Sequence, residues 1–465
     1  MLFSSLPFLY YFLPFTILLY LLAPKRLKNA ALLVCSLLFY AWGEPRYVLV
    51  MAFSILLGYG FGLAIEHWRG HWQEKLAAWL SVGISLGLLG YFKYANFFLE
   101  SFHAATGLSV PTLRVALPIG ISFYTFQMIS YTVDVYRGKV AAQRNLIHIA
   151  AYIAMFPQLI AGPIVRYADI ATQLAHREHT LAGTAAGIRR FVLGLGKKVI
   201  LANTLGELCD AFLHASNASV LYHWLYAISV TLYIYFDFSG YSDMAIGLGK
   251  LFGFDFPENF NYPLISKSAT EFWRRWHMTL GSWFRDYLYI PLGGNRVKKS
   301  RWLLNLLIVW LATGLWHGAA WNFAVWGLFF AFFLILEKLW LKPLLEKSRV
   351  LSHVYLLVLV SVSFVIFNAD TLGQAAGEIA TMFGIGSAPL LCAEGVYQLK
   401  NYGVVLFLAV VGATPAVTRL FHKLETTRAG KILQVAEPIG LLALLLTATA
   451  CLVNGSFNPF LYFRF

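Results

Sequence analysis

The chain has 465 residues, of which 59% are hydrophobic and only 12% are charged, and its mean hydropathy is +0.65. A soluble domain carries about 25% charged residues, so the composition excludes an ordinary soluble protein and predicts an all-α polytopic membrane protein. The net charge of +14 does not indicate nucleic-acid binding. The basic residues lie mainly in short loops between apolar runs, where the positive-inside bias accounts for them. The alternation typical of outer-membrane barrel strands is absent.

The N-terminal part predicts four crossings. The first apolar run, residues 3–22, lacks the basic start of a cleavable signal peptide and ends at a cluster of Lys25, Arg26 and Lys28. Because cytoplasmic loops are rich in Lys and Arg, the N-terminus is expected outside the cytoplasm. The next three runs are residues 30–42, 49–65 and 77–92.

Two stretches in the middle of the chain predict irregular membrane segments. Residues 117–127 combine proline, glycine and hydroxyls. One interpretation is that protein or a wet cavity surrounds this polar backbone. The other is tight helix packing through small residues. The run 147–165 is interrupted near Pro157 and Pro163, which favours a re-entrant or kinked element. Further on, Lys197 and Lys198 are expected to snorkel or to face an internal cavity.

Two carboxylates stand out in the hydroxyl-rich stretch 233–243. Asp237 and Asp243 are six residues apart, so they lie on different faces of one helix or flank a break at Gly240. They could form a proton relay or a cation site. The favoured interpretation is structural pairing with nearby arginines, for which Arg274 and Arg275 are the candidates.

Residues 255–301 are rich in Trp, Arg and Tyr, with apolar runs too short to span, which predicts amphipathic helices in the inner interface. Clear crossings then resume at residues 303–315, 323–339, 355–367, 404–417 and 439–453. The alternation of basic and non-basic loops predicts about twelve crossings with both termini outside the cytoplasm. No internal repeat of the kind found in many transporters is visible.

The spacing of the cysteines predicts no metal site. Cys35, Cys209, Cys392 and Cys451 are far apart and lie mostly in or beside apolar runs. They show no metal-binding spacing and no disulfide framework, and are expected to be core residues.

The most informative residue is His317, which lies in the stretch 314–321 between two long apolar runs. A second histidine, His277, precedes it by 40 residues (317 − 277). Ionisable groups at membrane depth are costly and indicate function by default, although a histidine hydrogen-bonded between helices is the plain alternative. Neutral imidazole is a general base near physiological pH and could take a proton from an alcohol that attacks an acyl carbonyl.

A basic belt accompanies the histidines. Its positive charges would suit the phosphates of a soluble acyl donor on the inner face, and could equally attract anionic lipid headgroups. The belt consists of Arg274, Arg275, Arg285, Arg296, Lys298 and Lys299.

A set of motifs resembles the membrane-bound O-acyltransferase family over nearly the whole chain and in the family's order. The motifs are PQ at 157–158, AGPI at 161–164, YFDFSGYSD at 235–243, NFNYP at 259–263, FWRRWH at 272–277, YIPLGG at 289–294 and WHG at 316–318. Within the family, the chain is most similar to the bacterial branch that O-acetylates alginate and other surface polysaccharides, including peptidoglycan. The branch that moves D-alanine onto teichoic acids is more distant.

The resemblance implies one membrane domain over residues 1–465. Its N-terminal helices would be 1–115, its motif-bearing core 116–340 and its C-terminal helices and tail 341–465. The implied fold is a ring of about 12 transmembrane helices, with re-entrant and interfacial helices, around a central tunnel where a cytoplasmic and an outer funnel meet. The implied location is the bacterial inner membrane.

The resemblance also implies the chemistry. His317 takes the place of the catalytic histidine, expected to act as general base, and His277 that of the second residue, expected to orient or polarise the acyl group. Acetyl-CoA is the implied donor, with no bound cofactor and no metal. The acetyl group would reach the polysaccharide directly or through a periplasmic or membrane-anchored esterase-like partner. The other residues expected to contact substrate are Trp316, Asp237, Asp243, Arg274, Arg275, Arg285 and Arg296.

The sequence leaves two alternatives to acyl transfer. A proton-coupled secondary transporter would use Asp237, Asp243 and His317 as a proton path, but the missing inverted repeat and the belt of short segments argue against it. A scaffold has no need of buried histidines.

The C-terminal tail carries the last candidate. Five of the nine residues 457–465 are aromatic, so they are expected to pack against protein or in the outer interface. One interpretation is an aromatic belt anchor. The other is that the tail folds back and brings the phenol of Tyr462 towards His317, where Tyr462 would accept the acyl group and pass it on.

Overall fold

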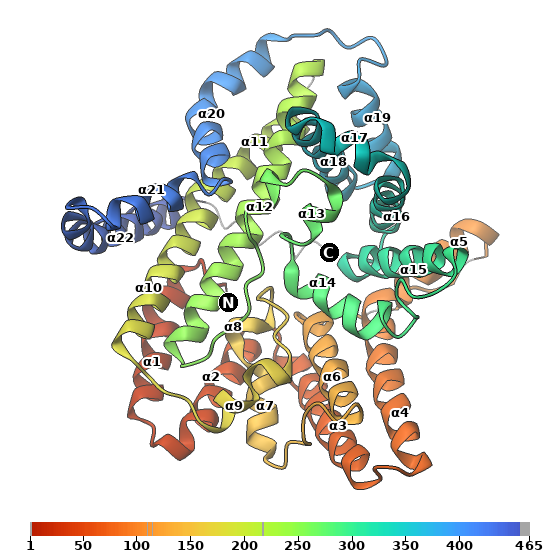
Figure 1. Ribbon diagram of the computed structural model, residues 1–465, viewed down its shortest axis with the longest axis vertical. Helices are drawn as coiled ribbons and strands as arrows, with labels where there is room; N and C mark the ends of the chain where they lie inside the picture. The colour runs from red at the N-terminus through yellow and green to blue at the C-terminus, as the bar shows by residue number, and fades with distance from the viewer. Residues whose placement is uncertain (1, 109, 114, 216–217, 456–465) are drawn as a thin grey trace. The chain divides into compact units, whose positions relative to one another are not determined.

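The computed structural model describes every residue except 1, 109, 114, 216–217 and 456–465 (Figure 1). All regular elements of the described residues are helices, which confirms the all-α prediction. These residues form two compact units, each built from separate stretches of chain. Unit 1 is Met1–Phe191 with Ser242–Glu258, and unit 2 is Val192–Tyr241 with Asn259–Phe465. The unit boundaries differ from the three predicted parts, and the single domain stays a prediction.

Unit 1 contains the N-terminal helices. They are α1 (Leu13–Leu22), α2 (Lys28–Gly43), α3 (Val48–His67), α4 (Trp72–Leu89), α5 (Ala95–Thr106), α6 (Ile121–Tyr136), α7 (Leu146–Ala154), α8 (Phe156–Leu159) and α9 (Tyr167–Ala175). Helices α3, α4 and α6 pack against one another and lie side by side in Figure 1. Helices α10 (Leu181–Gly196) and α12 (Val220–Leu251) each run from one unit into the other.

The proline- and hydroxyl-rich segment at the start of α6 is enclosed by protein. Nearly all side chains of α6 are buried. Glycines of α3 make room for them: a Cβ atom at Gly62 would lie 2.6 Å from the Tyr131 hydroxyl oxygen, and one at Gly58 would lie 2.5 Å from the Met128 sulfur. The burial agrees with the first interpretation of residues 117–127, a surrounding of protein, and the glycines of α3 show close helix packing next to that stretch.

The predicted break in the run 147–165 is confirmed. Helix α7 ends at Ala154, and α8 begins at Phe156, with Pro157 in its first turn. Proline suits this position because its ring fixes φ and the first helical N–H groups have no partner within the helix. All residues from 149 to 165 are buried in protein. Whether this element enters a membrane from one side stays a prediction.

Unit 2 contains the C-terminal two-fifths of the chain and the histidines. Its helices are α11 (Asn203–Leu213), α13 (Ala269–Trp273), α14 (Met278–Phe284), α15 (Lys299–His317), α16 (Trp321–Leu336), α17 (Lys342–Lys347), α18 (Arg349–Asn368), α19 (Leu372–Met382), α20 (Ala393–Gly412), α21 (Ala416–Glu425) and α22 (Ala429–Asn454). Three π-helical stretches belong to it as well: η5 (Lys197–Ala202), η7 (Arg285–Tyr289) and η8 (Glu337–Leu341).

Helices α15 and α16 cross closely because glycines stand at their contact (Figure 1). A Cβ atom at Gly314 would lie 2.2 Å from the Phe323 carbonyl oxygen, and one at Gly327 would lie 2.2 Å from the Trp310 carbonyl oxygen. The crossing holds the C-terminal end of α15, where His317 lies, against the start of α16. Before α15, the short elements η6 (Pro263–Ile265), α13, α14 and η7 interrupt irregular chain, which confirms that this part of residues 255–301 lacks a spanning helix.

Six helical segments among the described residues are long and apolar enough to cross a membrane. They are Pro45–His67, Trp72–Thr106, Trp321–Lys347, Arg349–Asn368, Ala393–Gly412 and Ala429–Asn454, and Phe8–Leu22 is a shorter apolar helix. They confirm a multi-pass membrane-embedded protein. Other predicted crossings, such as residues 30–42 and 303–315, fall in helices that do not meet this criterion. The count of about twelve and the placement of the termini stay predictions.

The four cysteines are free thiols. Cys35 and Cys209 are buried, as expected for core residues, and Cys392 is half-buried. The expectation is wrong for Cys451, which is exposed on α22. Only 6% of the most apolar window of α22 is buried inside the protein, so its side chains form an outer, apolar surface of unit 2.

Candidate active site

His277 lies in a tight turn between α13 and α14 and has a left-handed backbone conformation, with φ 44° and ψ 51°. For a residue with a Cβ atom this conformation costs about 1–2 kcal/mol, so neighbouring contacts must hold it. The chain at residues 259–261 forms two backbone hydrogen bonds with the chain at residues 275–278. Met278 N–H donates to the Asn259 carbonyl at 3.0 Å, and Asn261 N–H donates to the Arg275 carbonyl at 2.9 Å. The NFNYP and FWRRWH motifs therefore lie side by side.

The His277 side chain is almost fully buried and is bound on one side only. Its Nδ1 lies 3.1 Å from Asn259 Oδ1, and its Nε2 is buried without a hydrogen-bond partner among the described residues. The turn that carries His277 lies outside the apolar spanning helices. Burial lowers the pKa of His277 well below its ordinary value, and the neighbouring His317 acts in the same direction. His277 is therefore neutral at physiological pH.

His317 forms the C-terminal end of α15 and is 5% exposed. The ring centroids of His317 and His277 are 6.2 Å apart. Unit 2 thus brings together the two histidines that are 40 residues apart in the chain.

Aromatic rings enclose both histidines. Trp316, Trp326 and Phe367 stand edge-on to His317, with centroid distances of 5.1, 5.1 and 5.4 Å. Trp316 also lies 5.8 Å from His277, and Phe238 of α12 lies 4.7 Å from it. Trp316 is therefore a neighbour of both imidazoles, and its expected contact with substrate stays a prediction. Such apolar walls keep water out and strengthen electrostatic interactions with a reacting group.

A buried carboxylate fixes the helix that leads into the His277 turn. Glu337 of η8 is 3% exposed and accepts hydrogen bonds from Ala269 N–H at 2.5 Å and from Thr270 N–H at 3.0 Å. It also accepts from the hydroxyls of Thr270 and Tyr355. These amides are free donors at the start of α13, so Glu337 caps that helix. Sequence reasoning missed this role, although an acidic residue inside the apolar run 323–339 was a visible signal.

Asp237 and Asp243 lie on one continuous helix, α12, without a break at Gly240. Asp237 forms an ion pair with Lys198 of η5, with an N–O distance of 2.6 Å, and both side chains are at most 2% exposed. Lys198 is therefore buried beside a counter-charge, and the expectation that it snorkels is wrong.

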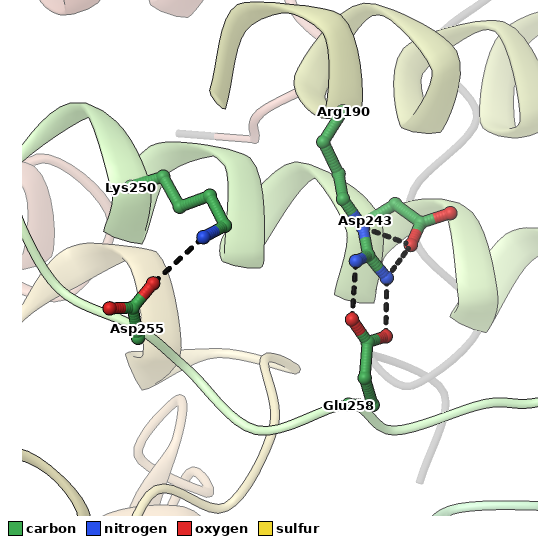
Figure 2. Close-up of polar contacts among 5 residues, drawn as sticks. All are labelled: Arg190, Asp243, Lys250, Asp255 and Glu258. Atoms are coloured by element: carbon green, nitrogen blue, oxygen red, sulfur yellow. Dashed lines mark hydrogen bonds and ion pairs between the residues drawn. The ribbon is translucent and has the colours of Figure 1, made fainter. Parts of the chain in front are cut away.

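In unit 1, Asp243 and Glu258 share the guanidinium of Arg190 (Figure 2). Arg190 Nε and Nη2 donate to Asp243 Oδ1 at 2.9 and 2.8 Å, and Nη1 and Nη2 donate to the two oxygens of Glu258 at 2.5 Å. Figure 2 also shows the ion pair between Lys250 and Asp255, 2.7 Å long. The contacts of Arg190 fasten α12 and the chain after it to α10, and the Lys250–Asp255 pair joins α12 to that chain.

The prediction of structural pairing with arginines is confirmed for Asp243, which pairs with Arg190, but not for Asp237, which pairs with Lys198. The predicted partners, Arg274 and Arg275, are wrong, because the partners are Lys198 and Arg190. Arg275 instead pairs with Glu271, four residues before it. Partner choice depends on which helices pack together, and that packing is invisible in the spacing of the residues.

The basic belt divides into different environments. Arg285 pairs with Asp286, and Arg296 is exposed. Arg274 lines a cleft of about 670 Å³. The other cations of this cleft were not predicted as site residues from the sequence. The cleft is lined by Lys267, Ser268, Thr270, Glu271, Arg274, Tyr289, Trp302, Leu306, Leu334, Glu337, Lys338, Lys342, Leu345, Glu346, Arg349 and Ser352.

The cleft combines charge with apolar wall. The exposed cations Arg274, Lys338, Lys342 and Arg349 stand at it together with leucines and the Trp302 ring. The Lys338 ammonium lies 4.2 Å above that ring. Positive charge suits phosphate groups, and the apolar wall suits an organic chain attached to them. The remaining candidate, Tyr462, lies outside the described residues, so its role as an acyl carrier stays a prediction.

Comparisons with known proteins agree with this site. The model of the MBOAT, membrane-bound O-acyltransferase family, matches residues 141–368, which include both histidines. The chain is 41% identical to a probable alginate O-acetylase AlgI of Azotobacter vinelandii over the full length of both proteins. It is 33% identical to a peptidoglycan O-acetyltransferase of Helicobacter pylori, over 84% of this chain and 81% of that protein. The chain belongs to the membrane-bound O-acyltransferase family and is an acyltransferase.

A third relative is similar over a shorter stretch. A teichoic acid D-alanyltransferase of Bacillus subtilis is 32% identical over 46% of this chain and 57% of its own length. The partial match agrees with the larger distance expected for the D-alanine branch.

We predict that the Lys198–Asp237 pair stabilises unit 2 only as a pair. Lys198→Met or Asp237→Leu alone should lower the free energy of unfolding by about 3–5 kcal/mol, because each leaves a buried charge uncompensated. The double variant should recover most of that loss. Unfolding in mixed micelles measures both, with Arg285→Met as the control for an exposed pair that contributes at most about 1 kcal/mol. A double variant less stable than either single variant would contradict the prediction.

Proposed function

We propose that this enzyme transfers an acetyl group from cytoplasmic acetyl-CoA across the bacterial inner membrane towards a cell-surface polysaccharide. The observation that carries the proposal is the buried pair of His277 and His317 inside an aromatic enclosure. A neutral imidazole has a lone pair that can take the proton of an alcohol acceptor, so it can act as a general base.

The chemistry needs no bound cofactor. The acceptor hydroxyl oxygen attacks the carbonyl carbon of the thioester while its proton passes to the imidazole of His317. The new C–O bond forms, the C–S bond then breaks, and the leaving thiolate takes the proton from the imidazolium. The products are the acetyl ester and free CoA, and His317 is neutral again.

The nature of the acyl group and acceptor follows from the relatives. Those with the broadest coverage carry names that specify O-acetylation of alginate or of peptidoglycan. An alginate-like exopolysaccharide or peptidoglycan is therefore the proposed final acceptor, reached directly or through a periplasmic or membrane-anchored esterase-like partner. The orientation, with both termini periplasmic, rests on the distribution of basic loops.

The donor is proposed to bind at the cleft that Arg274 lines. Arg274 precedes His277 by only three residues (277 − 274), so a phosphate held there stays close to the reacting centre along the chain. The cleft also contains Lys338, Lys342 and Arg349. Residues 342–349, which include α17, carry Lys342, Lys347 and Arg349, and this basic character supports a cytoplasmic location. The diphosphate of CoA is a ligand of matching charge.

The transporter alternative has less support. Its proton path would need Asp237 and Asp243 to change charge, but each is held in an ion pair with a cation. The family is one of acyltransferases, and acyl transfer also accounts for the second histidine, which a transporter would leave unexplained.

Removal of the proposed base should abolish transfer. We expect His317→Ala to lower the rate of CoA release from acetyl-CoA by about 10²–10⁴-fold, since a positioned base contributes that much. The matched control is His422→Ala, at an exposed histidine of α21. Thiol release by purified protein in nanodiscs measures the rate, and thermal unfolding checks that both variants are folded. Wild-type turnover in folded His317→Ala would exclude His317 as the base.

Charge reversal in the cleft should weaken donor binding. We expect Arg274→Glu to raise the KM for acetyl-CoA about tenfold or more with a smaller effect on kcat, because a hydrogen bond to a charged group contributes roughly 1.5–3 kcal/mol. Lys423→Glu, at an exposed residue of the basic segment 419–431, controls for general attraction of an anion to this face. An unchanged KM in Arg274→Glu would identify the cleft as a site for another anion, such as a lipid headgroup.

A further inference from the structure

The side-chain oxygen of Asn259 is shared by three groups of the His277 turn. His277 Nδ1 lies 3.1 Å from it, the Thr279 N–H donates to it at 3.3 Å, and the Thr279 hydroxyl lies 2.9 Å from it. Asn259 is fully buried, with no exposed surface. Its main-chain carbonyl accepts from Met278 N–H at the same time. Both parts of this residue therefore bind the turn.

These contacts determine which way the Asn259 amide points. A backbone N–H can only donate a hydrogen bond, so the atom facing Thr279 N–H must be the carbonyl oxygen and not the NH₂ group. The reversed amide would set two donors against each other. The assignment therefore follows from the main chain and does not depend on the histidine.

The amide in turn determines the tautomer of His277. A carbonyl oxygen only accepts, so Nδ1 of His277 must carry the proton that it donates to Asn259. In a neutral imidazole the second nitrogen then has a lone pair. That nitrogen, Nε2, is buried and has no hydrogen-bond partner among the described residues. His277 Nε2 can therefore accept a hydrogen bond in the site but cannot donate one.

We propose that Asn259 is a positioning residue that fixes His277 as the Nδ1–H tautomer, so that Nε2 accepts a hydrogen bond from a substrate hydroxyl or amide. The inference rests on the proposed acyl transfer for its role, and on the contacts of Asn259 for the tautomer. It changes the expectation that His277 polarises the acyl carbonyl. In this tautomer Nε2 has no proton to donate to a carbonyl oxygen, so His277 orients an N–H or O–H group instead.

The left-handed backbone of His277 supports the same view. Among the described residues, only His277 and Tyr262 combine positive φ with a side chain, and Tyr262 lies in the same NFNYP motif as Asn259. Backbone strain of this kind persists where the surroundings impose it, and it gathers at functional sites. The backbone hydrogen bond from Met278 to Asn259 and the side-chain contact to Nδ1 hold His277 from two directions.

The tautomer is measured directly by ¹⁵N NMR of protein labelled at its histidines in nanodiscs, without substrate. The His277 signals are assigned as those missing from His277→Gln. We expect a protonated Nδ1 and an unprotonated Nε2 in the wild type, and loss of this single tautomer in Asn259→Leu. Asn305→Leu is the matched control, because Asn305 is a buried asparagine that binds the carbonyls of Leu292 and Gly294. Its substitution should leave the His277 signals unchanged.

Steady-state kinetics supply the second arm. Loss of the residue that orients a catalytic imidazole costs up to about 10⁴-fold in kcat in serine proteases, so Asn259→Leu should lose kcat by about 10²-fold or more with little change in KM. Asn259→Asp keeps an accepting oxygen and should therefore retain the Nδ1–H tautomer. This variant tests the assignment even if Asn259→Leu does not fold.

The outcomes separate the inference from the proposed function. A protonated Nε2 in the wild type, an unchanged tautomer in Asn259→Leu, or a protonated Nε2 in Asn259→Asp would each overturn the tautomer assignment, whatever reaction the enzyme performs. A changed tautomer with wild-type kcat would overturn the positioning role. Absence of acetyl transfer in the wild type, with the expected tautomer present, would contradict the proposed function alone.

Discussion

The site of unit 2 depends on buried polar side chains that satisfy an irregular backbone. Between α12 and α15 the chain has only short helices, so many of its N–H and C=O groups lack helical partners. In an apolar interior each unpaired group costs free energy, and such backbone is stable only where protein replaces water. Asn259, Glu337 and Asn305 provide these replacements. They bind respectively the His277 turn, the start of α13 and the carbonyls before α15.

Glu337 and the glycines between α15 and α16 explain why the histidines meet. Glu337 comes from the π-helical end of α16, and so joins the helix after His317 to the helix before His277. Close glycine contacts bring α15 against α16. The histidine pair is therefore held by two connections, one polar and one through packing. The dry aromatic enclosure around the imidazoles is a result of this arrangement, and it raises the strength of every hydrogen bond made inside it.

Much of this organisation could be predicted from the sequence. The low fraction of charged residues predicted the fold class, Pro157 predicted the break after α7, and His277 and His317 were recognised as a pair. These features are encoded locally, in composition, in proline and in motifs. Spatial partners were not predictable in the same way. Lys198, the partner of Asp237, lies on another helix 39 residues earlier (237 − 198), and no local pattern specifies that contact.

The tautomer of His277 could not be predicted from the sequence. The NFNYP motif drew attention to Asn259, but only the Thr279 N–H shows which end of its amide faces the histidine. The cations of the cleft come from the residues that flank α13, from η8, from α17 and from the start of α18, and meet only when these elements are folded together. Among the described residues, six helices can be recognised as crossings by length and apolarity alone. Buried helices such as α6 need not be apolar throughout, so this criterion does not identify them.

The central claim is that one buried histidine site joins a donor on the cytoplasmic side to an acceptor on the other side. The most direct measurement uses the purified enzyme in oriented proteoliposomes, with acetyl-labelled acetyl-CoA outside and an oligosaccharide acceptor, with any required esterase-like partner, enclosed. The account predicts that free CoA appears outside while the label becomes ester-linked inside, only where the cytoplasmic face of the enzyme is outward. Ester formation only when donor and acceptor share one compartment would contradict the claim.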